Sequence, residues 1–141
     1  AAITGATSDG RHCGDPLAVH FSPVPGRAAL GPTAALLSAA KTDLREGVAG
    51  SPVFLTVSRS LIPRDDEGLR IVDALIRSSL DLGLPILSFA INDIAAMRDA
   101  VLRPGEHEDL IVRIWGFNAR FIDLTPEMQN HVIDRTIGQA S

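Results

Sequence analysis

Residues 109–129 read Asp-Leu-Ile-Val-Arg-Ile-Trp-Gly-Phe-Asn-Ala-Arg-Phe-Ile-Asp-Leu-Thr-Pro-Glu-Met-Gln, and their pattern decides the fold of the C-terminal part of the chain. Because apolar and β-branched side chains dominate them, residues 110–117 and 120–124 are predicted to be extended. The Thr-Pro-Glu triplet at 125–127 predicts a helix start, with threonine as the cap and proline at the first helical position. Gly116 lies inside the first of these runs, where a glycine usually marks a bulge, a turn or a close backbone approach.

Strands and helices alternate on the N-terminal side of this stretch. Buried strands are predicted at residues 52–58 and 85–91, because both runs are apolar and rich in branched side chains. Helices are predicted over residues 33–44, from Asp65 or Asp66 to about Leu82 with Gly83 as the stop, from Asn92 or Asp93 to just before Pro104, and from Thr125 onward. The alternation predicts the α/β class. Residues 1–32 are rich in turn signals and are expected to form loops that lie against something larger.

Three of these helices have a predicted apolar face. The faces consist of Leu69, Val72, Leu75, Ile76 and Leu80; of Ile94, Met97 and Val101; and of Met128, Val132 and Ile133.

The composition is that of a soluble globular domain and excludes several classes of function. The chain has 141 residues, of which 45% are hydrophobic, and a formal net charge of −4. Its basic residues are scattered, so neither nucleic acid nor an anionic membrane is an expected partner. No apolar run is long enough to span a membrane and no leader opens the chain, so the expected compartment is the cytoplasm. Cys13 is the only cysteine and the histidines lack ligand spacing, so neither a disulfide nor a metal site is expected.

The stretch around Gly116 resembles the signature of the glycyl radical enzymes. The core of that signature is Arg-Val-Ser/Ala-Gly-Tyr/Phe, and residues 113–117 read Arg-Ile-Trp-Gly-Phe. In the family, a Leu-Thr/Ser-x-Glu-x-Gln run and a helix ending in Ile-x-Arg-Thr follow. Residues 124–129 and 133–136 match both.

The resemblance extends over nearly the whole chain, with gaps in its middle third. Further matches occur in the family's order at residues 7–11 (Thr-Ser-Asp-Gly-Arg), 14–18 (Gly-Asp-Pro-Leu-Ala), 22–27 (Ser-Pro-Val-Pro-Gly-Arg) and 31–34 (Gly-Pro-Thr-Ala). The last two look more like the dehydratase, lyase and decarboxylase branch than the pyruvate formate-lyase branch.

The resemblance implies both a fold and a chemistry. The implied fold is the C-terminal part of a ten-stranded α/β barrel, with the glycyl radical loop and a terminal helix. Gly116 is the implied radical site, from which a radical S-adenosylmethionine activating enzyme removes one hydrogen, and no bound cofactor is implied. A backbone carbon radical must flatten, and glycine alone has no β-carbon to crowd that geometry.

The family passes the stored radical to a cysteine thiol, which then takes a hydrogen from the substrate. That cysteine stands in a Gly-x-Cys context well before the region matched here, so a larger partner chain is implied. Cys13 is expected to be a small, partly buried side chain, with a chance reactive thiol as the minor alternative.

The implied function is that of a radical-carrying C-terminal subunit, or fragment, of a split enzyme that is not catalytic alone. Its reaction would be dehydration, C–X bond cleavage, decarboxylation or fumarate addition. One alternative is a spare part that replaces an oxygen-cleaved radical domain, and another is a non-catalytic module that has lost the radical. Residues 1–60 are expected to complete the barrel of the partner, and residues 61–141 to form the radical domain.

Three neighbours of Gly116 are candidates for supporting its loop. Arg113 either holds the loop through bonds to carbonyls or is a charge on the strand face. Trp115, where serine or alanine is usual, either fills a gap in the core or shields the radical from oxygen. Phe117 lies within the family's variation between tyrosine and phenylalanine.

Overall fold

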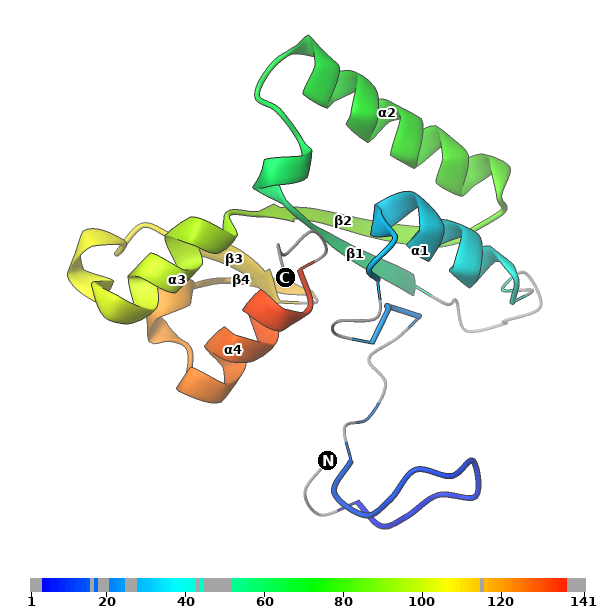
Figure 1. The fold of residues 1–141 in the computed structure, drawn as a ribbon, viewed down its shortest axis with the longest axis horizontal. Helices are drawn as coiled ribbons and strands as arrows, with labels where there is room; N and C mark the ends of the chain where they lie inside the picture. Colours follow the sequence, from blue (N-terminus) through cyan, green and yellow to red (C-terminus); the bar gives the residue numbers. More distant parts are fainter. Residues whose placement is uncertain are drawn as a thin grey trace.

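Helices and strands form two packed groups in the computed structural model of this chain (Figure 1). The structure describes residues 4–15, 17, 21–24, 28–42, 44, 52–114 and 116–136. Within them the arrangement is mixed α/β, as the alternation of predicted elements indicated.

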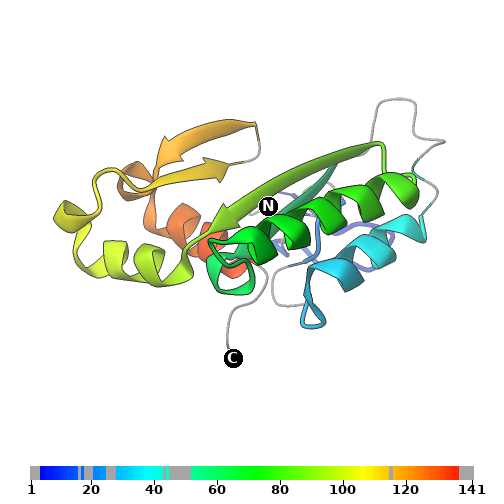
Figure 2. The ribbon, with the colours of Figure 1, turned by 90° about the horizontal axis from the view of Figure 1, so that it is seen from above.

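The first group is a β-α-β unit covered by one further helix. Strands β1 (Pro52–Ser58) and β2 (Ile86–Asn92) are parallel and in register along their whole length. Parallel strands need a crossover connection, which α2 (Asp66–Asp81) supplies after the short 3-10 turn η2 (Arg59–Leu61). Helix α1 (Gly31–Ala40) lies beside α2 on the same face of the sheet (Figures 1 and 2).

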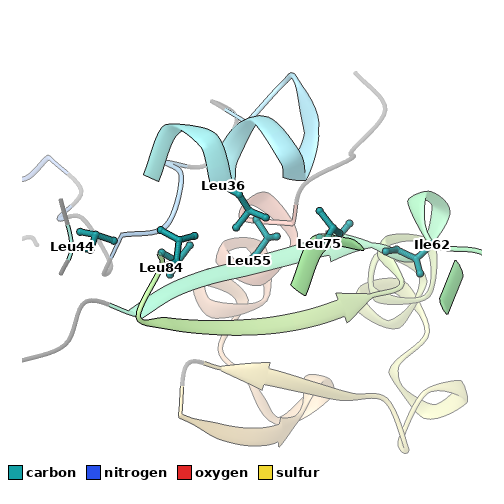
Figure 3. Packing of buried hydrophobic residues seen from close by; sticks show 8 residues of the cluster. Leu36, Leu44, Leu55, Ile62, Leu75 and Leu84 are labelled. Atoms are coloured by element: carbon teal, nitrogen blue, oxygen red, sulfur yellow. The ribbon is translucent and has the colours of Figure 1, made fainter. Parts of the chain in front are cut away.

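The first hydrophobic core fills the space between these two helices and the sheet. Leu36 of α1 and Leu55 of β1 are fully buried and lie against each other (Figure 3). The buried members are Leu36, Leu44, Val53, Leu55, Val57, Ile62, Leu75 and Leu84. The strand predicted at residues 52–58 is confirmed and the second strand begins one residue later than predicted, whereas the first helix ends at Ala40 rather than Leu44.

Helix α2 has the predicted ends, but only Val72 and Leu75 of its predicted apolar face meet the core. The Asp65 carboxylate accepts a hydrogen bond from the Gly68 N–H at 3.0 Å, and Gly83, with φ of 73°, follows the C-terminal cap. Leu69 and Leu80 of the predicted face are 71% and 67% exposed. The side that meets the core carries Gly68, Ile71, Val72, Leu75 and Ser79. Apolar spacing missed this because small residues occupy the positions where the helix passes close to other parts of the chain.

The second group surrounds a β-hairpin. It contains α3 (Ile94–Leu102), the 3-10 turn η3 (Pro104–Glu106), strands β3 (Ile111–Ile114) and β4 (Phe117–Arg120), the turn η4 (Phe121–Asp123) and α4 (Pro126–Asp134). Its core consists of Ile94, Met97, Ala100, Val112, Ile114, Phe121, Val132 and Ile133. The two strands are antiparallel and form a sheet separate from the β1–β2 pair.

The caps of the second group are confirmed, but two other expectations are wrong. Asp93 and Thr125 cap α3 and α4 through their side chains, as predicted. Val101, assigned to a buried face, is 47% exposed, and its neighbour Ala100 is buried instead. The segment 120–124 is not an extended strand: β4 begins at Phe117, directly after the turn, and the chain then coils into η4 so that Phe121 enters the core.

Arg11 organises the N-terminal segment, which extends away from both cores (Figure 1). Its guanidinium donates to the carbonyl oxygens of Asp15 at 2.9 Å, of His12 at 3.0 Å and of Gly5. Cys13 is a free, exposed thiol, so the expectation that it is partly buried is wrong. The described part of this segment forms no helix or strand that could pack over Cys13, so the thiol stays exposed. The predicted extended piece at 17–21 lies mostly outside the described residues.

The buried residues of the first core end at Leu84, and those of the second core begin at Ile94. The domain boundary expected between residues 60 and 61 lies between β1 and α2. It was defined by which part completes the barrel of a partner, so it stays a prediction. Among the described residues, no group of three or more acidic, histidine or cysteine side chains is arranged to hold a metal ion. None of the helices in that part of the chain combines the length and the apolar character needed to cross a bilayer.

Candidate functional site

Gly116 lies at the tip of the hairpin formed by β3 and β4. Ile114 pairs with Phe117 across the hairpin, so only two residues connect the strands. Gly116 is exposed in this turn, and Phe117 beside it is 57% exposed. Trp115, and with it both of the roles expected for that residue, lies outside the described residues.

The backbone around Gly116 does not require a glycine. A β-carbon built on Gly116 would have no atom of the described residues within 4 Å outside its two chain neighbours, and its φ is not among the positive values of the described glycines. Gly68 is the opposite case, because a β-carbon there would lie 1.9 Å from the Pro63 carbonyl oxygen. Of the three explanations for a glycine at this position, the turn agrees with the hairpin. Neither a close backbone approach nor a positive φ explains why the residue is a glycine.

Arg113 lies on the exposed face of the hairpin. Its Nη1 is 3.4 Å from Oδ1 of Asn118, the residue opposite it on β4. Of the two roles expected for Arg113, the contact with an exposed cross-strand neighbour fits a strand-face charge better than a set of bonds to loop carbonyls.

Two side chains of the C-terminal helix region hold the backbone of this hairpin. Gln129 of α4 donates its Nε2–H to the carbonyl oxygen of Phe121 at 3.1 Å, directly after β4. Arg135 follows α4 and donates Nη2–H to the carbonyl oxygen of Arg113 in β3. One backbone carbonyl of β3 and one directly after β4 are thus bonded to the same helical segment.

The end of α4 is itself tied to the first group. Thr136 is 2% exposed, donates its hydroxyl to the Val132 carbonyl at 2.9 Å and accepts from the Asn92 amide nitrogen at 3.3 Å. Asn92 is the last residue of β2, so this buried contact connects the parallel sheet to the helix that holds the hairpin.

Burial dominates the electrostatics of the α4 end. It lowers the pKa of the Arg135 guanidinium, whose Nε is buried without a hydrogen-bond acceptor among the described residues. Burial, assisted by the positive charge of Arg135, also lowers the pKa of His131 below its ordinary value. At the end of β4, Arg120 pairs with the exposed Asp123 of η4, and the hydrogen bonds with this carboxylate raise the pKa of Arg120.

A cavity of about 420 Å³ opens where β1 and β2 end. Its walls are Arg59, Arg64, Ile91, Asn92, Asp93, Met97, Leu110, Ile111 and Val112. The lining includes the base of β3 but neither Gly116 nor Arg113. This cavity therefore does not bring a ligand to the hairpin tip.

The sequence pattern predicts one extended run over residues 110–117, whereas in the structure Arg113 and Phe117 lie on opposite strands of a hairpin with Gly116 in its turn. The pattern assigned no role to Gln129 or Arg135. Both residues stand in the tail motifs at 124–129 and 133–136. Polar residues on a short helix that also has an apolar face were the available signal, but the partner carbonyls lie 8 and 22 residues away. Only the folded chain identifies them.

Known proteins resemble this chain in sequence. A family model described as "Glycine radical" matches residues 17–122. Isethionate sulfite-lyase of Bilophila wadsworthia (strain 3_1_6) is 35% identical over 137 residues, which are 95% of this chain and 16% of that protein. Trans-4-hydroxy-L-proline dehydratase of Clostridioides difficile is 30% identical over 135 residues, which are 95% of this chain and 17% of that protein.

A solved structure supports the same comparison. The glycerol-bound B12-independent glycerol dehydratase of Clostridium butyricum superposes with a TM-score of 0.80 at 38% identity, over 96% of this chain and 17% of that one. The chain thus spans only 16 to 17% of the length of these relatives.

Proposed function

This chain belongs to the glycyl radical enzyme family, and from that premise we propose that it stores an unpaired electron on the α-carbon of Gly116. The observation that carries the proposal is the glycine itself. It stands at an exposed hairpin tip where a β-carbon would meet nothing and where φ is not positive, so chemistry rather than packing explains the residue. A glycine α-carbon can become planar and share the electron with both adjacent peptide groups.

The proposed chemistry needs two partners. A radical S-adenosylmethionine activating enzyme removes one hydrogen atom from the Gly116 α-carbon, and no cofactor stays bound to the chain. The glycyl radical then takes the hydrogen atom of a cysteine thiol, and the resulting thiyl radical takes one from the substrate. Cys13 does not fill this role in the proposal, because it lies on the N-terminal segment that extends away from the hairpin. The thiol therefore belongs to the larger part of the enzyme.

Exposed apolar side chains support docking on that larger part. Leu30 before α1, Leu69 in α2 and Leu102 at the end of α3 are 88%, 71% and 80% exposed, and docking on the larger part would cover apolar side chains of this kind. A stored radical also has to be kept from water and oxygen, whereas Gly116 and Phe117 are open to solvent here.

The parallel sheet supports the same proposal. Strands β1 and β2 form a sheet of two strands among the described residues, so each has one edge without a strand partner there. Parallel sheets usually have more strands and are covered on both faces. We propose that this pair completes a ten-stranded α/β barrel whose other strands lie in the larger part. That part is either a separate chain or the remainder of the same polypeptide, and the assembly acts in the cytoplasm.

The reaction proposed for the assembled enzyme is of the dehydratase and lyase type. The relatives named above are a sulfite-lyase and two dehydratases. The residues that would select the substrate lie outside the chain in this proposal, because the cavity in the chain does not reach Gly116.

Anaerobic activation tests the proposal. The chain is incubated with its activating enzyme, a reductant and S-adenosylmethionine, with and without the larger part, and its electron paramagnetic resonance spectrum is recorded. We expect a doublet from the single remaining hydrogen of Gly116, absent in Gly116→Ala and present in Gly105→Ala, which changes an unconstrained glycine elsewhere. A doublet that persists in Gly116→Ala, or no signal in any combination, contradicts the assignment.

Complementation separates the modes of assembly. A chain that restores turnover to an oxygen-cleaved full-length enzyme acts as a spare part. A chain that supports turnover only with a large protein lacking this region acts as a subunit.

A further inference from the structure

The hairpin that carries Gly116 has little support of its own. Each of its strands has four residues, and they pair only with each other among the described residues. An isolated two-stranded hairpin is marginally stable in water, so its position must be set by contacts outside it. One face supplies Val112 and Ile114 to the second core, whereas the tip extends beyond them.

Polar contacts with the α4 segment hold β3 and the residue that directly follows β4. Gln129 bonds the carbonyl of Phe121, next to the end of β4, and Arg135 bonds the carbonyl of Arg113 in β3. Gln129 and Arg135 are six positions apart, a rise of about 9 Å along the helix axis at 1.5 Å per residue. Two separated attachment points restrict both the position of the hairpin and its rotation.

The α4 segment is a firm support for these contacts. Val132 is fully buried, Ile133 is 7% exposed, and the contact between Thr136 and Asn92 ties the end of the helix to β2. Through α4, the hairpin is therefore held in a defined position relative to the parallel sheet.

Arg135 is unusual for a residue that serves packing alone. Its Nε is buried and has no acceptor among the described residues, although a buried donor without an acceptor is unfavourable. An apolar side chain would fill the same space without that penalty. The Nε of Arg11 has the same feature, so the role proposed for Arg135 rests on its bond to the β3 carbonyl.

We propose that Gln129 and Arg135 are positioning residues, which form a clamp that fixes the α-carbon of Gly116 relative to the thiol on the larger part of the enzyme. This inference rests on the proposed radical function and adds a role for two residues outside the Gly116 motif. Hydrogen-atom transfer depends steeply on the separation of the two atoms, so a hairpin that is free to shift transfers the radical slowly. The clamp acts through backbone carbonyls, and neither side chain reacts.

Hydrogen exchange tests the clamp without using the radical. The variants are Gln129→Met, Arg135→Met and their combination, made in the assembled enzyme. We expect the hairpin amides over residues 112–119 to exchange roughly three- to tenfold faster for each bond lost, with the α2 amides unchanged. Asn130→Met removes an exposed amide from the same helix, and Arg70→Met removes an exposed charge from α2; both controls should match the wild type. Arg135→Lys keeps a donor and should recover part of the protection.

Radical transfer tests the positioning role. After activation in D2O, the thiol carries deuterium, so repeated transfer replaces the Gly116 hydrogen and collapses the doublet to a singlet. We expect the collapse rate per radical to fall tenfold or more in the double variant and to stay unchanged in both controls. This readout requires no substrate.

The possible results have distinct meanings. Hairpin exchange equal to that of the controls overturns the clamp, and so does Arg135→Lys behaving like Arg135→Met. Faster exchange with an unchanged collapse rate shows a structural bond and overturns the positioning role. A wild-type enzyme that forms no doublet at all contradicts the proposed function instead, while the exchange data still decide whether Gln129 and Arg135 hold the hairpin.

Discussion

The amide nitrogen of Asn92 lies 3.3 Å from the hydroxyl oxygen of Thr136, and both side chains are at most 5% exposed. This contact joins residues 44 positions apart, one at the end of β2 and the other just after α4. Because the hydroxyl also donates to the Val132 carbonyl, Thr136 satisfies two groups that would otherwise be buried without partners. The two hydrophobic cores are thus connected by a polar contact that tolerates little displacement.

Replacing Thr136 by valine should destabilise the chain. The substitution preserves shape but leaves the buried Asn92 amide without its acceptor, for an expected loss of about 1–3 kcal/mol in the free energy of unfolding. Urea unfolding measures it, with the exposed Thr42→Val as the matched control. Adding Asn92→Leu to Thr136→Val should recover part of the loss, since the buried amide that lacks an acceptor is then removed; a loss of stability in the double variant that equals or exceeds the sum of the two single losses would contradict this account.

Gly68→Ala should be among the most damaging glycine substitutions in the described part of the chain. The new methyl group would lie 1.9 Å from the Pro63 carbonyl oxygen, and backbone cannot rotate away as a side chain can. We expect a loss of about 3 kcal/mol, because α2 must shift from the core to relieve the overlap. Thermal unfolding compares it with Gly105→Ala, whose methyl group has open space. Equal melting temperatures for the two variants would show that the close approach is not real.

Gly116→Ala should separate stability from chemistry. Nothing lies within 4 Å of the added β-carbon apart from the chain neighbours, so the free energy of unfolding should change by no more than about 0.5 kcal/mol. The paramagnetic doublet should nevertheless be lost. Circular dichroism melts before activation provide the measurement, and a large drop in melting temperature would mean that the glycine has a structural role at the turn.

His131 should make the chain less stable in mild acid. Burial and the nearby Arg135 charge lower its pKa in the folded state below the ordinary value of 6.5, so the unfolded chain binds a proton more readily. Its stabilising contribution is therefore complete above that ordinary value and is lost as the pH falls through the folded-state pKa. His131→Gln should reduce the difference in urea midpoint between about pH 7 and pH 5, whereas the exposed His12→Gln should not. An unaltered pH dependence in His131→Gln would exclude this histidine as the cause.

Much of the fold follows from short-range patterns. The caps Asp65, Asp93 and Thr125, and the stop at Gly83, depend on side chains that bond backbone groups at most three residues away, so they are legible in the sequence. The strand at 52–58 is predictable because branched apolar residues fill it.

The wrong expectations concern which side of an element is buried. Leu69 and Val101 fit helical apolar spacing, yet both are exposed, while Gly68 and Ala100 are buried in their place. Helical spacing defines a face, but the shape of the neighbouring surface selects which residues meet it. Exposed leucines are also what a docking surface requires, and a single chain cannot distinguish a docking face from a core face.

The candidate site also has a part that the sequence determines and a part that only the tertiary structure determines. Gly116 was singled out by an ordered set of motifs that resembles the glycyl radical enzymes, and such motifs are visible without coordinates. Tertiary structure alone decided what holds it: the bonds from Gln129 and Arg135, and the contact between Asn92 and Thr136, join groups far apart in the chain. A residue's chemical type is written in the sequence, whereas the carbonyl that its side chain reaches depends on how the whole chain packs.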